Sequence, residues 1–160
     1  MKPLFATETV HTSPYGEYFF AGVGGERVLF SRADEGKVAV AGSMQRVTDS
    51  FHPARRIHVG TCGGAAGRIN RFDVVAPERV VIYHIAPAVG DSKEAIAEYS
   101  TSLSLPARLP VPAVKATMYS ADRDLTAAGL RELNAPHRPV VADWEWGPSP
   151  GSLTGMRHPH

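Results

Sequence analysis

Hydrophobic and polar positions in the first third of the chain change from the spacing of strands to that of a helix. Residues 18–22 and 27–31 have strand composition, and Gly24-Gly25 between them is typical of a hairpin turn. Over residues 40–51 apolar side chains recur at i, i+4, i+7 and i+11, which is one face of a helix. We expect this helix to end at His52, because a residue before proline is disfavoured in helical geometry.

The remainder of the chain alternates short apolar runs with helical segments. Helices are expected at 93–103, with Asp91 or Ser92 as the N-cap, and at 124–133. Strands are expected at 4–6, 56–59, 73–76, 80–82, 114–119 and 139–143. Strands that alternate with helices predict an α/β layer fold, and the length favours one domain.

Composition excludes several classes of protein. With 43% hydrophobic and 21% charged residues the chain resembles an ordinary soluble globular protein, and a net charge of +1 favours neither nucleic acid nor a membrane surface as partner. Residues 1–10 lack the features of a signal peptide. The single cysteine, Cys62, excludes an internal disulfide and suits a cytoplasmic protein. The histidines lack metal-ligand spacing, so we expect no metal and no cofactor.

Two segments at strand ends carry candidate chemistry. Gly60-Thr61-Cys62-Gly63-Gly64 follows an expected strand, where glycines let the backbone approach a ligand and Thr61 adds a hydroxyl. In Asp143-Trp144-Glu145 the carboxylates can accept bonds from sugar hydroxyls while the indole packs on the sugar ring. Each has a simpler interpretation, a tight turn for the first and a solvated strand end for the second.

Three further side chains have weaker signals. Glu8 can act as a general acid or position a water molecule, or it can be a carboxylate in the first turn of a helix. Cys62 as a nucleophile has no base partner that the sequence identifies, and a buried small thiol is commoner. His84 can reach a ligand, although a structural histidine is the more frequent case.

Six short segments between Glu8 and Glu145 follow one another in a recognisable order. They are Gly36-Lys37-Val38, Gly60-Thr61-Cys62-Gly63-Gly64, Phe72-Asp73-Val74-Val75, Tyr83-His84, Ser120-Ala121-Asp122 and Asp143-Trp144-Glu145. In order and spacing they resemble the motifs of the purine nucleoside phosphorylase/nucleosidase superfamily, most closely those of 5'-methylthioadenosine/S-adenosylhomocysteine nucleosidases. The chain departs from these motifs at Cys62, where the family has Ala, and at Phe72, where it has Gly. It also has Ile85 in place of Asp and Asp143-Trp144 in place of Glu-Met.

The resemblance implies a three-layer α/β/α phosphorylase-like fold with a mixed central sheet, and it implies roles for individual residues. Thr61, Cys62 and Gly63 would lie beside the ribose and the nucleophile, which is water in nucleosidases and phosphate in phosphorylases. Trp144 would pack on the sugar and Glu145 would bind its 2'- and 3'-hydroxyls. Glu8 is the nearest candidate for the early glutamate that positions the attacking water.

The segment after Glu145 departs from the resemblance. Residues 146–160 are rich in Pro and Gly and lack periodicity, so we expect a family-like domain over 1–145 and an irregular tail over 146–160. The family's later Ser-Asp strand, whose Asp protonates the purine, and its final helix are not found there. We therefore expect a C-terminally truncated or frameshifted member of the family.

These features predict a protein that cleaves the N-glycosidic bond of a purine nucleoside, weakly or not at all without the Asp that protonates the purine. The alternatives are a purine nucleoside phosphorylase, which would also use phosphate, or a non-catalytic remnant that binds nucleosides or oligomerises. A missing strand would leave a sheet edge and apolar surface uncovered, so a homo-oligomer is expected.

Overall fold

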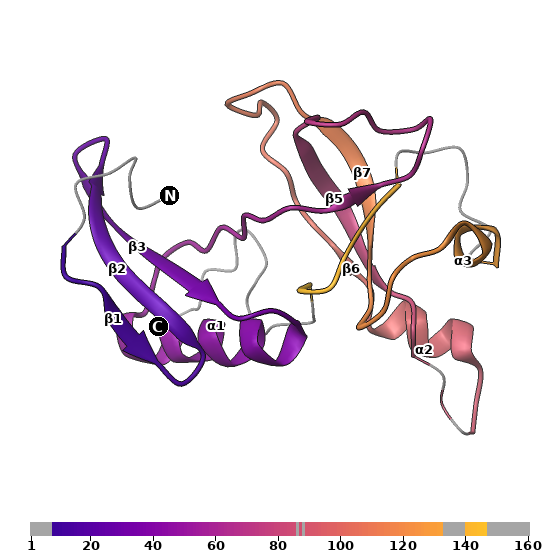
Figure 1. Cartoon of the computed structure of the whole chain (residues 1–160), viewed down its shortest axis with the longest axis horizontal. Coiled ribbons are helices and arrows are strands. Elements are labelled where there is room, and N and C mark those ends of the chain that lie inside the picture. The colour runs from indigo at the N-terminus through magenta and orange to yellow at the C-terminus, as the bar shows by residue number, and fades with distance from the viewer. Residues whose placement is uncertain (1–7, 86, 88, 133–139, 147–160) are drawn as a thin grey trace. The chain divides into compact units, whose positions relative to one another are not determined.

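The computed structural model describes residues 8–85, 87, 89–132 and 140–146. The chain forms two compact units, Met1–Pro53 and Ala54–His160 (Figure 1), and each is described by itself. The strand expected at 4–6 and residues 147–160 of the expected tail lie outside the described residues.

An antiparallel sheet with the strand order β1-β2-β3 forms the first part of the N-terminal unit. Its strands are β1 (His11–Ser13), β2 (Gly16–Val23) and β3 (Glu26–Ala33). Val23 pairs with Glu26 on either side of Gly24 and Gly25, whose φ angles are 59° and 84°. Both glycines adopt the left-handed conformation that two-residue hairpin loops require, so the predicted hairpin is confirmed.

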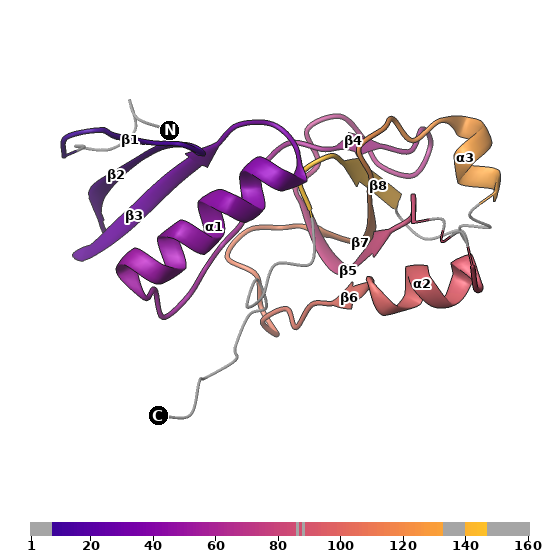
Figure 2. The same ribbon diagram turned by 90° about the horizontal axis from the view of Figure 1, so that it is seen from below.

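Helix α1 (Lys37–Phe51) follows the sheet and contacts β3. The Ser31 and Ser43 hydroxyls lie 2.9 Å apart between strand and helix, and Ser43 is buried. The helix ends as predicted at His52, whose φ of 44° is left-handed and whose N–H donates to the Thr48 carbonyl at 3.0 Å. Figure 2 shows α1 running along the sheet.

The C-terminal unit is built on a mixed sheet with the strand order β4-β8-β7-β5-β6. Strands β5 (Val75–Ile82), β7 (Val114–Ser120) and β8 (Val140–Asp143) are parallel, while β4 (Gly63–Gly64) and β6 (Thr101–Ser102) are antiparallel to their neighbours. Helices α2 (Ser92–Glu98) and α3 (Ala127–Glu132) belong to the same unit. The mixed sheet and its helices form an α/β fold, as predicted.

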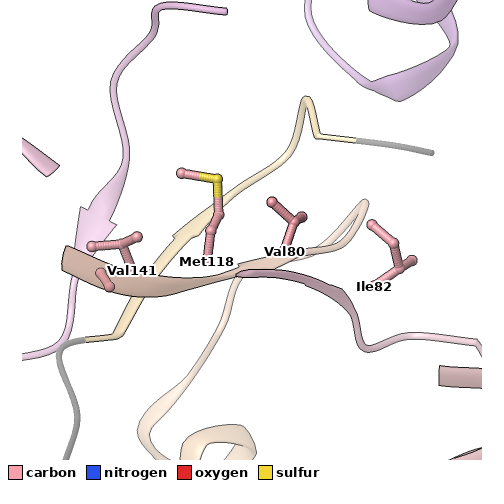
Figure 3. Packing of buried hydrophobic residues seen from close by; sticks show 5 residues of the cluster. Val80, Ile82, Met118 and Val141 are labelled. Atoms are coloured by element: carbon pink, nitrogen blue, oxygen red, sulfur yellow. The ribbon is translucent and has the colours of Figure 1, made fainter. Parts of the chain in front are cut away.

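The core of this unit lies on both faces of the sheet, because successive side chains of a strand point to opposite faces. One cluster consists of Val80, Ile82, Ala116, Met118 and Val141, with Trp146 among the residues packed against it (Figure 3). The other cluster consists of Val81, Tyr83, Tyr119, Ala121 and Val140, against which Ile96 of α2 and Leu125 pack. Strands buried on both faces explain the continuous apolar runs in the sequence.

Three predicted strands were wrong in detail. Residues 73–76 and 80–82 belong largely to one strand, β5, which continues through Pro77 with a register shift before Arg79. Proline cannot donate to the ladder, and the bulge accommodates it without ending the strand. The expected strand at 56–59 is not formed, and Ile57 and Val59 are 83% and 72% exposed. An apolar alternation makes a strand only where a partner is available.

The two C-terminal helices are shorter than their periodicity predicted. The Asp91 carboxylate accepts the Lys93 N–H at 2.8 Å and begins α2, as expected for an N-cap, but the helix ends at Glu98. Thr101 and Ser102 pair with β5 as the edge strand β6. Helix α3 begins at Ala127, three residues after the predicted start.

Candidate functional site

The three parallel strands of the C-terminal unit end at one edge of the sheet. Ile82 pairs with Ser120, and Ser120 pairs with Asp143, so the residues that follow each strand emerge side by side. In open α/β sheets ligands bind at the carboxyl ends of the strands. Two of the segments singled out from the sequence, Ser120-Ala121-Asp122 and Asp143-Trp144-Glu145, therefore meet at the edge where such a fold binds its ligand.

Strand β4 brings the glycine segment to the same strand end. Gly63 pairs with Ala142 and Gly64 with Val141, and the N–H of Ala65 donates to the Val140 carbonyl at 3.0 Å. Thr61, Cys62 and Gly63 are exposed. Although the residue is exposed, the surrounding chain partly desolvates the Cys62 thiol, and this desolvation and the nearby Asp143 carboxylate both raise the pKa of the thiol, which favours the neutral form over the nucleophilic thiolate.

A pocket of about 310 Å³ opens beside these strands. It unites Gly63 and Trp144, which the sequence had marked separately, while Thr61, Cys62 and Glu145 are not among its lining residues. The Trp144 side chain is 44% exposed and can therefore contact a ligand. The remaining lining residues are Gly64, Ala65, Asp124, Leu125, Val140, Val141 and Ala142.

Asp143 is the buried carboxyl group of this edge, with 8% of the residue exposed. Its Oδ1 accepts the Trp146 N–H at 3.4 Å. Burial raises the pKa of the Asp143 carboxyl, and the Ser120 hydroxyl and the Trp146 N–H offset this only in part. The Ser120 hydroxyl is wholly buried and makes no hydrogen bond of standard geometry with the described residues.

Glu145 and Glu8 lie in different surroundings. The half-buried Glu145 accepts the Trp144 N–H at Oε2, 3.2 Å away. Glu8 belongs to the N-terminal unit, where its two carboxylate oxygens accept from Nε and Nη2 of Arg27 at 3.0 and 2.8 Å. This contact lowers the pKa of the Glu8 carboxyl. An ionised Glu8 can orient a water molecule, but it is poorly suited to donating a proton at neutral pH.

His84 lies two residues beyond β5. Its Nε2 is 3.7 Å from Oδ2 of Asp122, and its buried Nδ1 has no hydrogen-bond partner among the residues that the structure describes. Over the described ranges, no three metal-ligating side chains come together, and no helix is long and apolar enough to cross a membrane.

The sequence of residues 2–142 matches the profile of the Phosphorylase superfamily. The chain belongs to this superfamily. The resemblance drawn from the six motifs is thus confirmed. No curated protein matches the chain.

Three solved structures of nucleosidases are similar in fold to this chain. The 5'-methylthioadenosine/S-adenosylhomocysteine nucleosidase of Neisseria meningitidis, in complex with methylthio-immucillin-A, is similar with a TM-score of 0.70 and 13% identity, over 91% of this chain and 69% of that one. S-adenosylhomocysteine nucleosidase of Streptococcus pyogenes, in complex with 5-methylthiotubericidin, is similar with a TM-score of 0.64 and 13% identity, over 88% of this chain and 65% of that one. The 5'-methylthioadenosine/S-adenosylhomocysteine nucleosidase of S. pneumoniae, with the transition-state inhibitor MT-ImmA, is similar with a TM-score of 0.64 and 15% identity, over 88% of this chain and 67% of that one. At these identities the likeness establishes the fold.

Two of the residues that line the pocket were not identified from the sequence. Asp124 and Leu125 line it, although their segment was expected to begin a helix. They follow Ser120 at the end of β7, and the carboxyl-edge rule applied to that strand would have included them. The sequence gives no indication that Asp143 is buried, because its burial depends on tertiary packing around the end of β8.

Proposed function

We propose that this chain binds a purine nucleoside of the methylthioadenosine/adenosylhomocysteine type at the carboxyl edge of β5, β7 and β8, and acts on its N-glycosidic bond. Membership of the superfamily and the nucleosidase-like fold support this proposal. The observation that carries it is the pairing of β4 with β8, because Gly63 and Trp144 then line one pocket.

Each residue of the edge has a role that suits its chemistry. Glycine backbone at Gly63 allows close approach of the ribose, and the exposed Trp144 indole offers an apolar face to the sugar or base. Glu145 would accept bonds from the ribose hydroxyls, and Thr61 and Cys62 would flank the nucleophile. Glu8 belongs to the N-terminal unit, where it pairs with Arg27, and it is the candidate for the glutamate that positions the attacking water only through the family resemblance.

The chemistry requires stabilisation of an oxocarbenium-like transition state and neutralisation of the departing purine. Ionised carboxylates near the ribose serve the first need. The second needs a group that protonates the departing purine. Phosphorolysis remains the alternative reaction, with phosphate in place of water.

A base-release assay tests the proposal, with adenine as the product from methylthioadenosine and adenosylhomocysteine and hypoxanthine as the product from inosine. Methylthioadenosine, adenosylhomocysteine and inosine are supplied with and without phosphate, and binding is measured in parallel by calorimetry. Trp144→Ala should weaken nucleoside binding roughly tenfold, since an aromatic contact is worth about 1 kcal/mol or more. Phe72→Ala is the matched control, because Phe72 is an exposed aromatic outside the pocket lining.

The outcomes separate the alternatives. Equal binding by the Trp144 variant and the control would reject the pocket as the nucleoside site. Phosphate-dependent release would select phosphorolysis. Turnover within a few-fold of that of an active nucleosidase would contradict the prediction of weak activity.

A non-catalytic assembly is the second candidate, favoured by the exposed apolar side chains of Ile57, Val59 and Phe72. It predicts self-association without adenine release. Light scattering over a range of concentrations tests it, and a monomer at the highest concentration would count against it.

A further inference from the structure

The turn after β8 carries both tryptophans of the chain, Trp144 and Trp146, with Glu145 between them. Trp144 lines the pocket, whereas Trp146 packs against the core cluster on the other side of the sheet. The three residues of the turn thus connect the pocket to the core.

Asp143 anchors this turn. Its main-chain carbonyl accepts the Ala121 N–H at 3.3 Å, which ties the end of β8 to the segment after β7. Its side chain is turned back to the Trp146 N–H at 3.4 Å. A buried carboxyl is costly unless it makes such bonds, so its presence here calls for a structural or functional reason.

We propose that Asp143 is a positioning residue, whose buried carboxyl holds the turn 144–146 so that Trp144 faces the pocket and Glu145 stands beside it. Asp143 acts through the hydrogen bond that its carboxyl accepts from the main-chain N–H of Trp146. That Asp143 favours nucleoside binding rests on the proposed function. That Asp143 fixes the conformation of residues 144–146 does not rest on it.

Several titratable groups surround the Asp143 carboxyl. They are the Cys62 thiol, the Glu145 carboxylate and His58, whose ring centroid is 5.2 Å from that of Trp146. The buried Ser120 hydroxyl lies on the adjacent strand. Burial raises the pKa of Asp143, so the carboxylate that accepts the Trp146 N–H takes up its proton at a higher pH than an exposed aspartate does.

Tryptophan fluorescence of the whole chain reads the turn directly, because both fluorophores lie in it. We expect the wild-type emission to shift as the pH falls through the raised pKa of Asp143, above the range of an exposed aspartate, because Asp143 then gains a proton and its bond to the turn weakens. Asp143→Asn carries no ionisable group, so the transition should vanish, and its spectrum at every pH should match that of the wild type at low pH, because both then present a neutral acceptor oxygen. Asp143→Ala should show the shifted emission at every pH, and stronger quenching by acrylamide.

Glu145→Gln and His58→Gln are the controls, since these side chains also lie close to a tryptophan of the turn. The inference is overturned if Asp143→Asn retains the transition, if either control abolishes it, or if Asp143→Ala has the wild-type spectrum while circular dichroism shows it folded. Should Asp143→Ala fail to fold, the comparison of Asp143→Asn with the wild type still decides.

A binding arm separates this inference from the proposed function. With 5'-methylthioadenosine as the probe, Asp143→Ala should lose roughly tenfold in affinity and Asp143→Asn should retain most of it. If the wild type binds no nucleoside, the proposed function fails, while the fluorescence result still stands for or against the hold on the turn.

Discussion

Gly64 and Gly63 are adjacent residues of β4, yet alanine should lower the stability of the fold at Gly64 only. A Cβ atom added at Gly64 would lie 2.9 Å from both Cβ and Cγ2 of Ile69. Carbon atoms in contact prefer about 3.5–4.0 Å, so the added methyl overlaps the base of a branched side chain. At Gly63 the nearest atom is the Ala142 carbonyl oxygen at 3.9 Å, which is ordinary contact.

The magnitude follows from two contributions. Overpacking of this kind costs about 1–3 kcal/mol. Neither glycine has a left-handed φ, so alanine is compatible with the backbone and gains about 0.4–1 kcal/mol by restricting the unfolded chain. Gly64→Ala should therefore lower the free energy of unfolding by about 1–2 kcal/mol, whereas Gly63→Ala should leave it unchanged or raise it slightly.

Urea denaturation of both variants measures the difference, and melting temperatures should differ by roughly 2–4 °C per kcal/mol. Ile69→Ala supplies a further check, because removing Cγ2 relieves part of the overlap. The double variant Gly64→Ala/Ile69→Ala should then be more stable than the sum of the single effects. Equal stability of the Gly64 and Gly63 variants would refute the steric reasoning.

Four other predictions concern stability. Met118→Ala, in the sheet core, should cost about 2–5 kcal/mol in urea denaturation, whereas Ile57→Ala, at an 83% exposed position, should stay within about 0.5 kcal/mol. Phe72 has a φ of 72°, so Phe72→Gly should stabilise by about 1 kcal/mol, and Phe72→Ala, which keeps a Cβ, should not. Asp91→Ala should cost about 0.5–2 kcal/mol through loss of the α2 N-cap, while Asp91→Asn should retain most of that stability. The pKa of Asp143 is raised in the folded chain, so its contribution to stability is complete below the ordinary carboxyl range and is lost as the pH rises through the folded value. Asp143→Asn should therefore gain stability relative to the wild type from acid to neutral pH, and a difference that is constant with pH would contradict this.

Local patterns predicted the elements that local interactions determine. Gly24-Gly25 indicated the hairpin because those two residues supply the turn geometry themselves. Helix α1 was found from its apolar face and its end at His52. The strand predicted at 56–59 was wrong, because an apolar alternation becomes a strand only if a neighbouring strand pairs with it, and the segment itself does not encode that neighbour.

The candidate site was predictable as a set of segments but not as a pocket. Motif order pointed to Gly63 and Trp144 separately, and only the β4–β8 register shows that both line one pocket. Asp124 and Leu125 join them from the end of β7. Such lining residues have no shared spacing in the chain, since three different strands deliver them.

Phe72 illustrates how a departure from a family motif acquires physical meaning. The sequence showed Phe where the resembling motif has Gly, and that comparison alone did not say what the glycine was for. The structure gives this residue a left-handed φ of 72°, a conformation that glycine adopts without penalty and phenylalanine does not. The side chain is also 87% exposed, so burial returns little of the cost. The motif glycine is therefore best explained by backbone geometry in the turn before β5, and the substitution affects stability without touching the pocket.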